Sequence, residues 1–118
     1  MKNPEIKSFV LTLPPMGTNH AYHTNQGRWF KDKKMHDWET LWLWKLKGKV
    51  HAVRKEFCQV NIGFFYADWR KHDIDSRIKP ILDLFEKLGA YKNDNVVTGM
   101  IVTKGYDKKN PRAEVSVY

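Results

Sequence analysis

Two aspartates separated by a single residue form the clearest chemical signal in the sequence. Asp73 and Asp75 flank Ile74 within residues 72–79, which read H-D-I-D-S-R-I-K. In an extended backbone, residues two apart point to the same side, so both carboxylates would face one way while Ile74 faces the core. Two carboxylates held this close repel each other unless a cation lies between them, and Mg²⁺ prefers oxygen ligands of this kind. The spacing therefore favours a divalent-cation site.

A third carboxylate and a lysine could complete such a site. Asp94 would join the pair if the chain folded back along the helix expected after residue 77. Three carboxylates on a basic protein are typical of metal-assisted phosphodiester hydrolysis, and Lys79 would then contact the scissile phosphate. The residues alone leave a plainer interpretation open, in which the acids belong to a solvated turn and Asp75 or Ser76 only caps the helix. Lys79 could likewise form an ordinary helical ion pair with Asp83.

The charge of the chain suggests a polyanionic partner, either nucleic acid or an anionic membrane. The 21 Lys and Arg residues outnumber the 13 Asp and Glu residues, which gives a net charge of +8. The basic excess is concentrated in residues 28–55, whereas acids slightly outnumber bases in residues 73–94. The candidate DNA contacts are Arg70, Lys71 and Arg77 beside the acids, Arg28, Lys31, Lys33 and Lys34 in the basic block, and Asn19 and His20 before it.

Composition excludes several classes of protein. The 118 residues suffice for one domain, expected to span residues 1–118. No apolar run approaches the roughly 18 residues of a membrane span, and no signal peptide is visible, so we expect a cytoplasmic protein with no membrane partner. The single cysteine, Cys58, excludes an intrachain disulfide and a cysteine-based zinc site, and we expect it to be buried.

Hydrophobic periodicity predicts an α+β fold, a small mixed sheet of about four strands packed against two helices. The expected strands are residues 6–13, 57–66, 96–106 and 113–118, and the expected helices are residues 33–53 and 77–88. The first helix should end or kink near Gly48, and Gly89 should close the second. Residues 16–30 are expected to form a long loop and residues 107–111 a hairpin connection. Trp38 and Trp42 belong to an apolar stripe that indicates core, whereas Trp44 lies off it.

The pattern as a whole is more specific than its parts. Residues 73–83 read D-I-D-S-R-I-K-P-I-L-D, and Leu88-Gly89, Asn93-Asp94 and Val97 follow. Earlier, residues 14–22 read P-P-M-G-T-N-H-A-Y. Together these stretches resemble the RusA family of Holliday-junction resolvases, and the resemblance covers nearly the whole chain.

The resemblance implies a small homodimeric endonuclease that depends on Mg²⁺, with Mn²⁺ as a substitute, and resolves four-way DNA junctions by paired nicks. Phages and prophages often encode such enzymes. The family's catalytic, metal-binding carboxylates fall on Asp73, Asp75 and Asp94, and its essential lysine falls on Lys79.

Two positions depart from the family pattern. Ser76 stands where the family usually has asparagine, and either residue can cap a helix. Asn93 stands where the family often has the first of two aspartates, which leaves Asp94 as the metal ligand. Asn93 and Asp83, which matches a frequent family acid, are expected to support the site.

Two rival functions remain open at this point. The chain could be a non-catalytic nucleic-acid-binding module, in which the basic block binds and the acids only cap helices. It could also be a nuclease for other branched DNA or for RNA.

Overall fold

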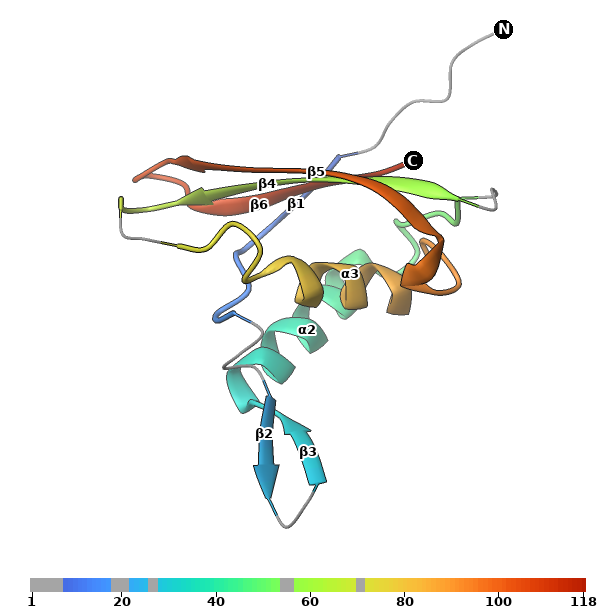
Figure 1. The fold of residues 1–118 in the computed structure, drawn as a ribbon, viewed down its shortest axis with the longest axis horizontal. Coiled ribbons are helices and arrows are strands. Elements are labelled where there is room, and N and C mark those ends of the chain that lie inside the picture. Colours follow the sequence, from blue (N-terminus) through green and yellow to red (C-terminus); the bar gives the residue numbers. More distant parts are fainter. Residues whose placement is uncertain (1–7, 18–21, 26–27, 54–56, 70–71) are drawn as a thin grey trace, which may run out of the picture.

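A mixed four-stranded sheet forms one layer of the domain, and two helices on one face of the sheet form the other (Figure 1). The computed structural model describes residues 8–17, 22–25, 28–53, 57–69 and 72–118. The strands, in spatial order, are β1 (Ser8–Leu11), β6 (Arg112–Val117), β4 (Cys58–Tyr66) and β5 (Val97–Tyr106). The helices are α2 (Lys33–Leu46) and α3 (Ile78–Lys87). The expected α+β class is confirmed.

The central strand β4 shows the alternation that the sequence predicted. Its buried side chains, which face the helices, are Cys58, Val60, Ile62, Phe64 and Tyr66. β4 pairs antiparallel with β6 and parallel with β5. Parallel pairing requires the chain to return to the same end of the sheet between the two strands, and α3 makes this return. The 3₁₀ helix η1 (Asp94–Val96) then leads directly into β5.

The helices pack against β4 through the apolar stripes that the sequence indicated. Ile81, Leu84 and Phe85 of α3 are buried, as are Trp38 and Trp42 of α2. Trp44 is exposed, as expected from its place off the stripe. Pro80 lies in the first turn of α3, where its missing N–H group costs no helical hydrogen bond. The tryptophan stripe is therefore core, and the burial of Cys58 is also confirmed.

The expectation of a long loop over residues 16–30 is wrong. Strands β2 (Tyr22–Asn25) and β3 (Arg28–Lys31) pair antiparallel and form a two-stranded hairpin, which projects away from the sheet (Figure 1). The pairing of Asn25 with Arg28 leaves two residues of sequence between the strands, a length typical of hairpins. Main-chain hydrogen bonds hold such a hairpin, so the hydrophobic pattern gave no sign of it.

Two other boundaries differ from the prediction. α2 ends at Leu46, short of residue 53, and this confirms the expected end near Gly48, which adopts a φ of 77°, a left-handed conformation that terminates the helix. Residues 107–111 do not form a hairpin connection, since β5 and β6 lie on opposite sides of β4. The connection instead crosses the end of β4, where the Asp107 N–H donates to the Tyr66 carbonyl oxygen at 2.8 Å. In the part of the chain that the structure describes, no helix is long and apolar enough to cross a membrane.

A buried carboxylate joins the hairpin to both helices. Glu39 of α2 is only 5% exposed, and its Oε2 accepts from the Lys31 ammonium of β3 at 2.7 Å. Its Oε1 accepts from the Lys87 ammonium of α3. Burial alone would raise the pKa of Glu39, but the hydrogen bonds from the two lysines outweigh burial and hold the pKa below its ordinary value. This charged cluster fixes the base of the hairpin on the helical layer.

The replacement Glu39→Gln should lower the free energy of unfolding at pH 7 by about 2 kcal/mol, because two charge-assisted hydrogen bonds are lost. A lowered carboxyl pKa stabilises the fold above the ordinary value of 4.5, and this stabilisation is lost as the pH falls through the folded-state pKa. Urea denaturation should therefore give a smaller difference between wild type and variant at pH 3 than at pH 7. Asp37→Asn, at an exposed acid of the same helix, is the control. An equal difference at both pH values would contradict the interpretation.

Candidate active site

An ion-pair cluster at the side of α3 brings together three of the residues singled out by the sequence. Lys79, in the first turn of α3, places its Nζ 2.7 Å from Oδ2 of Asp94 and 3.1 Å from Oδ1 of Asp83. The hydrogen bond to Asp94, followed by that to Asp83, raises the pKa of Lys79 well above its ordinary value. The lysine is therefore fully charged at neutral pH. The helical ion pair with Asp83 that the sequence suggested is therefore present, and Lys79 forms a second ion pair with Asp94.

Asp94 reaches Lys79 because the chain reverses direction after α3. Gly89 has a φ of 85° and ends the helix, and the buried Tyr91 donates through its hydroxyl to the Leu82 carbonyl oxygen at 2.5 Å. The Asp94 N–H then donates to Oε1 of Glu86 at 2.9 Å, which ties η1 to the last turn of α3. The loop thus folds back along the helix, as the site requires.

Asn93 supports η1 by capping it. Its side-chain oxygen accepts from the Asn95 N–H at 3.1 Å, in the position of an N-cap residue. Asn93 thus stabilises the short helix that begins with Asp94, and its supporting role in the site stays a prediction.

The two paired aspartates lie in a turn, not in an extended segment. Both the N–H and the hydroxyl of Ser76 donate to the Asp73 carbonyl oxygen, at 3.2 and 3.0 Å, and the Ile78 N–H donates to the Asp75 carbonyl oxygen at 3.3 Å. The expectation that Ile74 faces the core is therefore wrong, since its side chain is 47% exposed. The plainer interpretation, a solvated turn capped by Asp75 or Ser76, is right about the exposed turn but wrong about the cap, because α3 begins after Arg77 with no side-chain cap. We call residues 73–76 the acidic turn.

Residues that the sequence did not single out hold the acidic turn at its N-terminal side. The ring of His72 stacks on the buried ring of Tyr66, with centroids 3.8 Å apart and planes within 5°. The His72 carbonyl oxygen accepts from the Lys104 ammonium of β5 at 2.8 Å. These contacts attach the acidic turn to β4 and β5, the two parallel strands of the sheet. An aromatic–histidine stack between residues six apart has no sequence signature that could have been read in advance.

The donor set at this site suits a hard divalent cation, but the carboxylates are not gathered around a single point. Asp73, Asp75, Asp83 and Asp94 offer only carboxylate oxygens, the ligand type that Mg²⁺ prefers. Within the described ranges, no three His, Cys, Asp or Glu side chains lie close enough to hold one metal ion. Mg²⁺ commonly takes one or two protein carboxylates and completes its shell with water and substrate phosphates. The residues therefore fit such an ion without a closed protein cage.

The candidate DNA contacts fall into three groups. Asn19, His20, Arg70 and Lys71 lie outside the described residues, and of Arg28 the structure describes the backbone in β3 alone. Lys33 and Lys34 are exposed in the first turn of α2. Lys31 and Arg77 are instead engaged within the domain, Lys31 with Glu39 and Arg77 with the Pro14 carbonyl oxygen.

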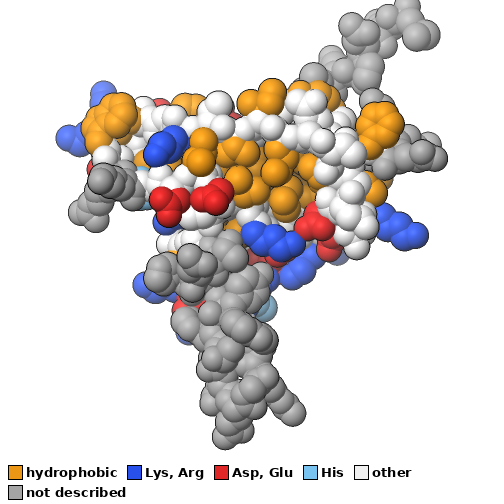
Figure 2. Space-filling model, viewed as in Figure 1, with side chains coloured by type: hydrophobic (Ala, Val, Ile, Leu, Met, Phe, Trp, Pro, Cys, Tyr) orange, Lys and Arg blue, Asp and Glu red, His pale blue; other side chains and the backbone are white. Residues whose placement is uncertain are grey.

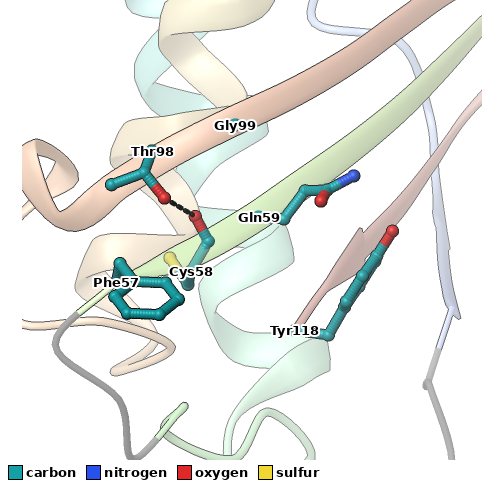
Figure 3. Close-up of a pocket in the computed structure, with 6 residues that line it drawn as sticks. All are labelled: Phe57, Cys58, Gln59, Thr98, Gly99 and Tyr118. Carbon is teal, nitrogen blue, oxygen red and sulfur yellow. Dashed lines mark hydrogen bonds between the residues drawn. The ribbon is translucent and has the colours of Figure 1, made fainter.

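A concave surface that does not include the ion-pair cluster lies where β4, β5 and β6 meet at one end of the sheet (Figure 3). It encloses about 310 Å³ and is lined by Phe57, Cys58, Gln59, Thr98, Gly99 and Tyr118. The Thr98 hydroxyl donates to the Cys58 carbonyl oxygen at 3.4 Å, and burial raises the pKa of the Cys58 thiol. None of the described residues that line this cavity carries an acidic or a lysine side chain.

Comparison with known proteins gives both the class and the family of this basic two-layer α+β domain. A family model described as "Endodeoxyribonuclease RusA" matches residues 12–118. A relative from Aquifex aeolicus (strain VF5), named crossover junction endodeoxyribonuclease RusA, is 31% identical over 106 residues, covering 88% of this chain and 83% of the relative. The chain belongs to the RusA family of endodeoxyribonucleases.

Removing Asp94 should affect the titration of Lys79 more than removing Asp83. The hydrogen bond to Asp94 is the shorter one and makes the larger contribution to the raised pKa. We therefore expect Asp94→Asn to return the Lys79 pKa closer to its ordinary value of 10.5 than Asp83→Asn does. NMR titration of the lysine Cε and Nζ signals, with Lys79→Arg to assign them, measures both shifts. An unperturbed lysine in the wild type would contradict the cluster.

Proposed function

We propose that this chain is a metal-dependent endodeoxyribonuclease that resolves four-way DNA junctions by paired symmetric nicks, using Mg²⁺ or Mn²⁺. The observation that carries the proposal is the cluster of Lys79 with Asp83 and Asp94, in a chain of the RusA family. The acidic turn immediately precedes the helix that carries Lys79. The relative from Aquifex aeolicus, whose name refers to crossover junctions, supports the choice of substrate.

Asp73, Asp75 and Asp94 would supply the carboxylates, with one or two of them on any one Mg²⁺ or Mn²⁺ ion and with water and the substrate phosphate completing its shell. When bound, such an ion lowers the pKa of a coordinated water and offsets the negative charge of the phosphate. The Asp94 main chain is fixed by its hydrogen bond to Glu86, so its carboxylate is oriented before substrate binds. The N–H and the hydroxyl of Ser76 both donate to the Asp73 carbonyl oxygen and so fix the backbone of the acidic turn, from which the two carboxylates extend.

Lys79 would supply a permanent positive charge next to the phosphate. The ammonium is protonated in the neutral range even at the ordinary lysine pKa of 10.5, so it acts as a hydrogen-bond donor and not as a base. Asp83, one helical turn away, holds the ammonium at the side of α3 whenever Asp94 makes other contacts. A fixed donor aimed at the developing charge stabilises the transition state more than the ground state.

Paired nicks require two active sites, and we propose that a homodimer supplies them. Among the described residues, β5 pairs only with β4, so its outer edge is open to another strand. Met100 and Ile101 at its centre are 45% and 55% exposed, and residues 97–103 carry no charge. Figure 2 has the same view as Figure 1, with the sheet above the helices. Hydrophobic side chains gather there just below the level of the sheet, and acidic and basic side chains lie along the lower margin of this group. A second copy paired at this edge would form a two-fold contact of like residues.

The replacement Asp75→Asn should lower the rate of nicking of a synthetic four-way junction in Mg²⁺ by about 100-fold or more, because it removes a charge needed to hold the metal. Junction binding should be preserved, since affinity depends mainly on basic residues. Asp37→Asn on α2 is the matched control and should cut normally. Flap, duplex and RNA substrates are compared in parallel, and a clear preference for one of them would identify the rival nuclease activity. A wild type inactive on every substrate would instead indicate a binding module.

The replacement Lys79→Ala should lower the single-turnover nicking rate by about 100-fold while changing the junction dissociation constant less than about threefold. The reason is that the ammonium is aimed at charge that develops only during reaction. Lys108→Gln, at an exposed lysine of the connection between β5 and β6, controls for the loss of one positive charge. An equal fall in rate and affinity would make Lys79 an ordinary phosphate contact.

A further inference from the structure

Arg77 bonds to a segment far away in the sequence. Its Nε donates to the carbonyl oxygen of Pro14 at 2.9 Å, and the Pro14 side chain is fully buried. Its guanidinium carbon lies 5.5 Å from the centroid of the Tyr66 ring, with Nη1 3.5 Å from the Tyr66 hydroxyl. The side chain is thus held between the strand that ends at Tyr66 and the segment that contains Pro14.

Gly17 makes a second close contact between the same two parts of the chain. A Cβ atom at Gly17 would lie 3.0 Å from Cβ of Ser76 and 3.1 Å from the Ser76 carbonyl oxygen. These distances are shorter than ordinary van der Waals contacts, so the backbone approaches the acidic turn as closely as a glycine permits. We call residues 14–17, together with Arg77, the brace.

The far end of the same segment is anchored to α2. The indole N–H of Trp38 donates to the Thr12 carbonyl oxygen at 3.0 Å, and the indole N–H of Trp42 donates to the Thr12 hydroxyl at 2.9 Å. Thr12 thus fixes the segment to the helical layer two residues before Pro14. The brace therefore connects a rigid helix to the acidic turn, and the chain beyond it continues to the β2–β3 hairpin.

We propose that Arg77 is a positioning residue: through the brace it holds the acidic turn in the orientation needed for cleavage, and it does not bind a DNA phosphate. This proposal rests on the proposed function, because it concerns the reaction of that site. Displacement of a reacting group by about 1 Å can lower a rate about 100-fold, so a contact that fixes the turn matters even without touching DNA. The guanidinium is suited to this role because its Nε–H and its planar face are used at the same time.

The variant Arg77→Lys distinguishes a residue that positions the acidic turn from one that binds a DNA phosphate. Arg77→Lys keeps the charge but cannot reproduce the Nε–H bond to Pro14 together with the contact to the Tyr66 ring. If Arg77 is a positioning residue, both Arg77→Lys and Arg77→Gln should lower the single-turnover nicking rate at least about tenfold, with the junction dissociation constant and its salt dependence unchanged. If Arg77 binds a phosphate, Arg77→Lys should be nearly normal, and Arg77→Gln should lower the slope of log affinity against log salt by about 1.

Gly17→Ala tests the brace without changing any charge. The added methyl group would displace Ser76, so we expect a fall in rate similar to that of Arg77→Lys, again with normal junction affinity. Because both changes act on one contact, the double variant should be no slower than the worse single variant. Additive losses would overturn the proposal, as would a normal rate for Arg77→Lys. Lys108→Gln serves as the control for charge and should keep its normal rate.

Hydrogen exchange of the DNA-free protein provides a readout that does not depend on activity. The Ser76 N–H, which bonds to the Asp73 carbonyl oxygen, should exchange at least about tenfold faster in Arg77→Lys and Gly17→Ala. The Leu88 N–H at the other end of α3 should be unaffected, whereas general destabilisation would accelerate both amides. If the wild type nicks no junction, the proposed function fails while the Ser76 exchange still decides whether the brace holds the turn. Unchanged Ser76 exchange in both variants would overturn the brace.

Discussion

Two carboxylates, those of Asp83 and Asp94, share the ammonium group of Lys79, and the geometry of the site follows from this contact. Negative groups so close together repel each other unless a cation lies between them, and here the chain supplies that cation itself. The contact joins the first turn of α3 to η1, which lies 15 residues further along the chain. Since η1 leads directly into β5, the ion pair lies close in the chain to the start of β5, which pairs with β4.

Local patterns were sufficient to predict the elements that position the site. The alternation in β4 and the apolar stripe of α3 came from burial on one face, and the positive φ of Gly89 fits its position after the last helical turn. The β2–β3 hairpin was missed because main-chain pairing leaves little trace in side-chain periodicity. The path from β5 to β6 across the end of β4 was missed because strand order depends on packing between distant elements, not on the turn residues themselves.

The candidate site was predictable in its residue types but not in its contacts. Lys79 and Asp94 were identified by spacing and by resemblance, and the structure joins them. The turn that contains Asp73 was not foreseeable, because it depends on hydrogen bonds from Ser76 that compete with an extended backbone. The bond from Arg77 to Pro14 spans 63 residues, so no local pattern could report it. Arg77, a basic residue beside acidic ones, thus makes a contact within the domain that its place in the sequence did not reveal.

The position of β1 in the sheet has a consequence for the order of folding. β1 pairs only with β6 among the described strands, and Ser8 lies opposite Ser116. The unit of β4, α3 and β5 is contiguous in sequence, so it can assemble while β1 still has no neighbour to pair with. Closing a loop of about 100 residues costs entropy before any contact repays it, and such non-local pairing slows folding. A ribosome-bound chain would therefore hold its first strand unpaired until the last strand has emerged.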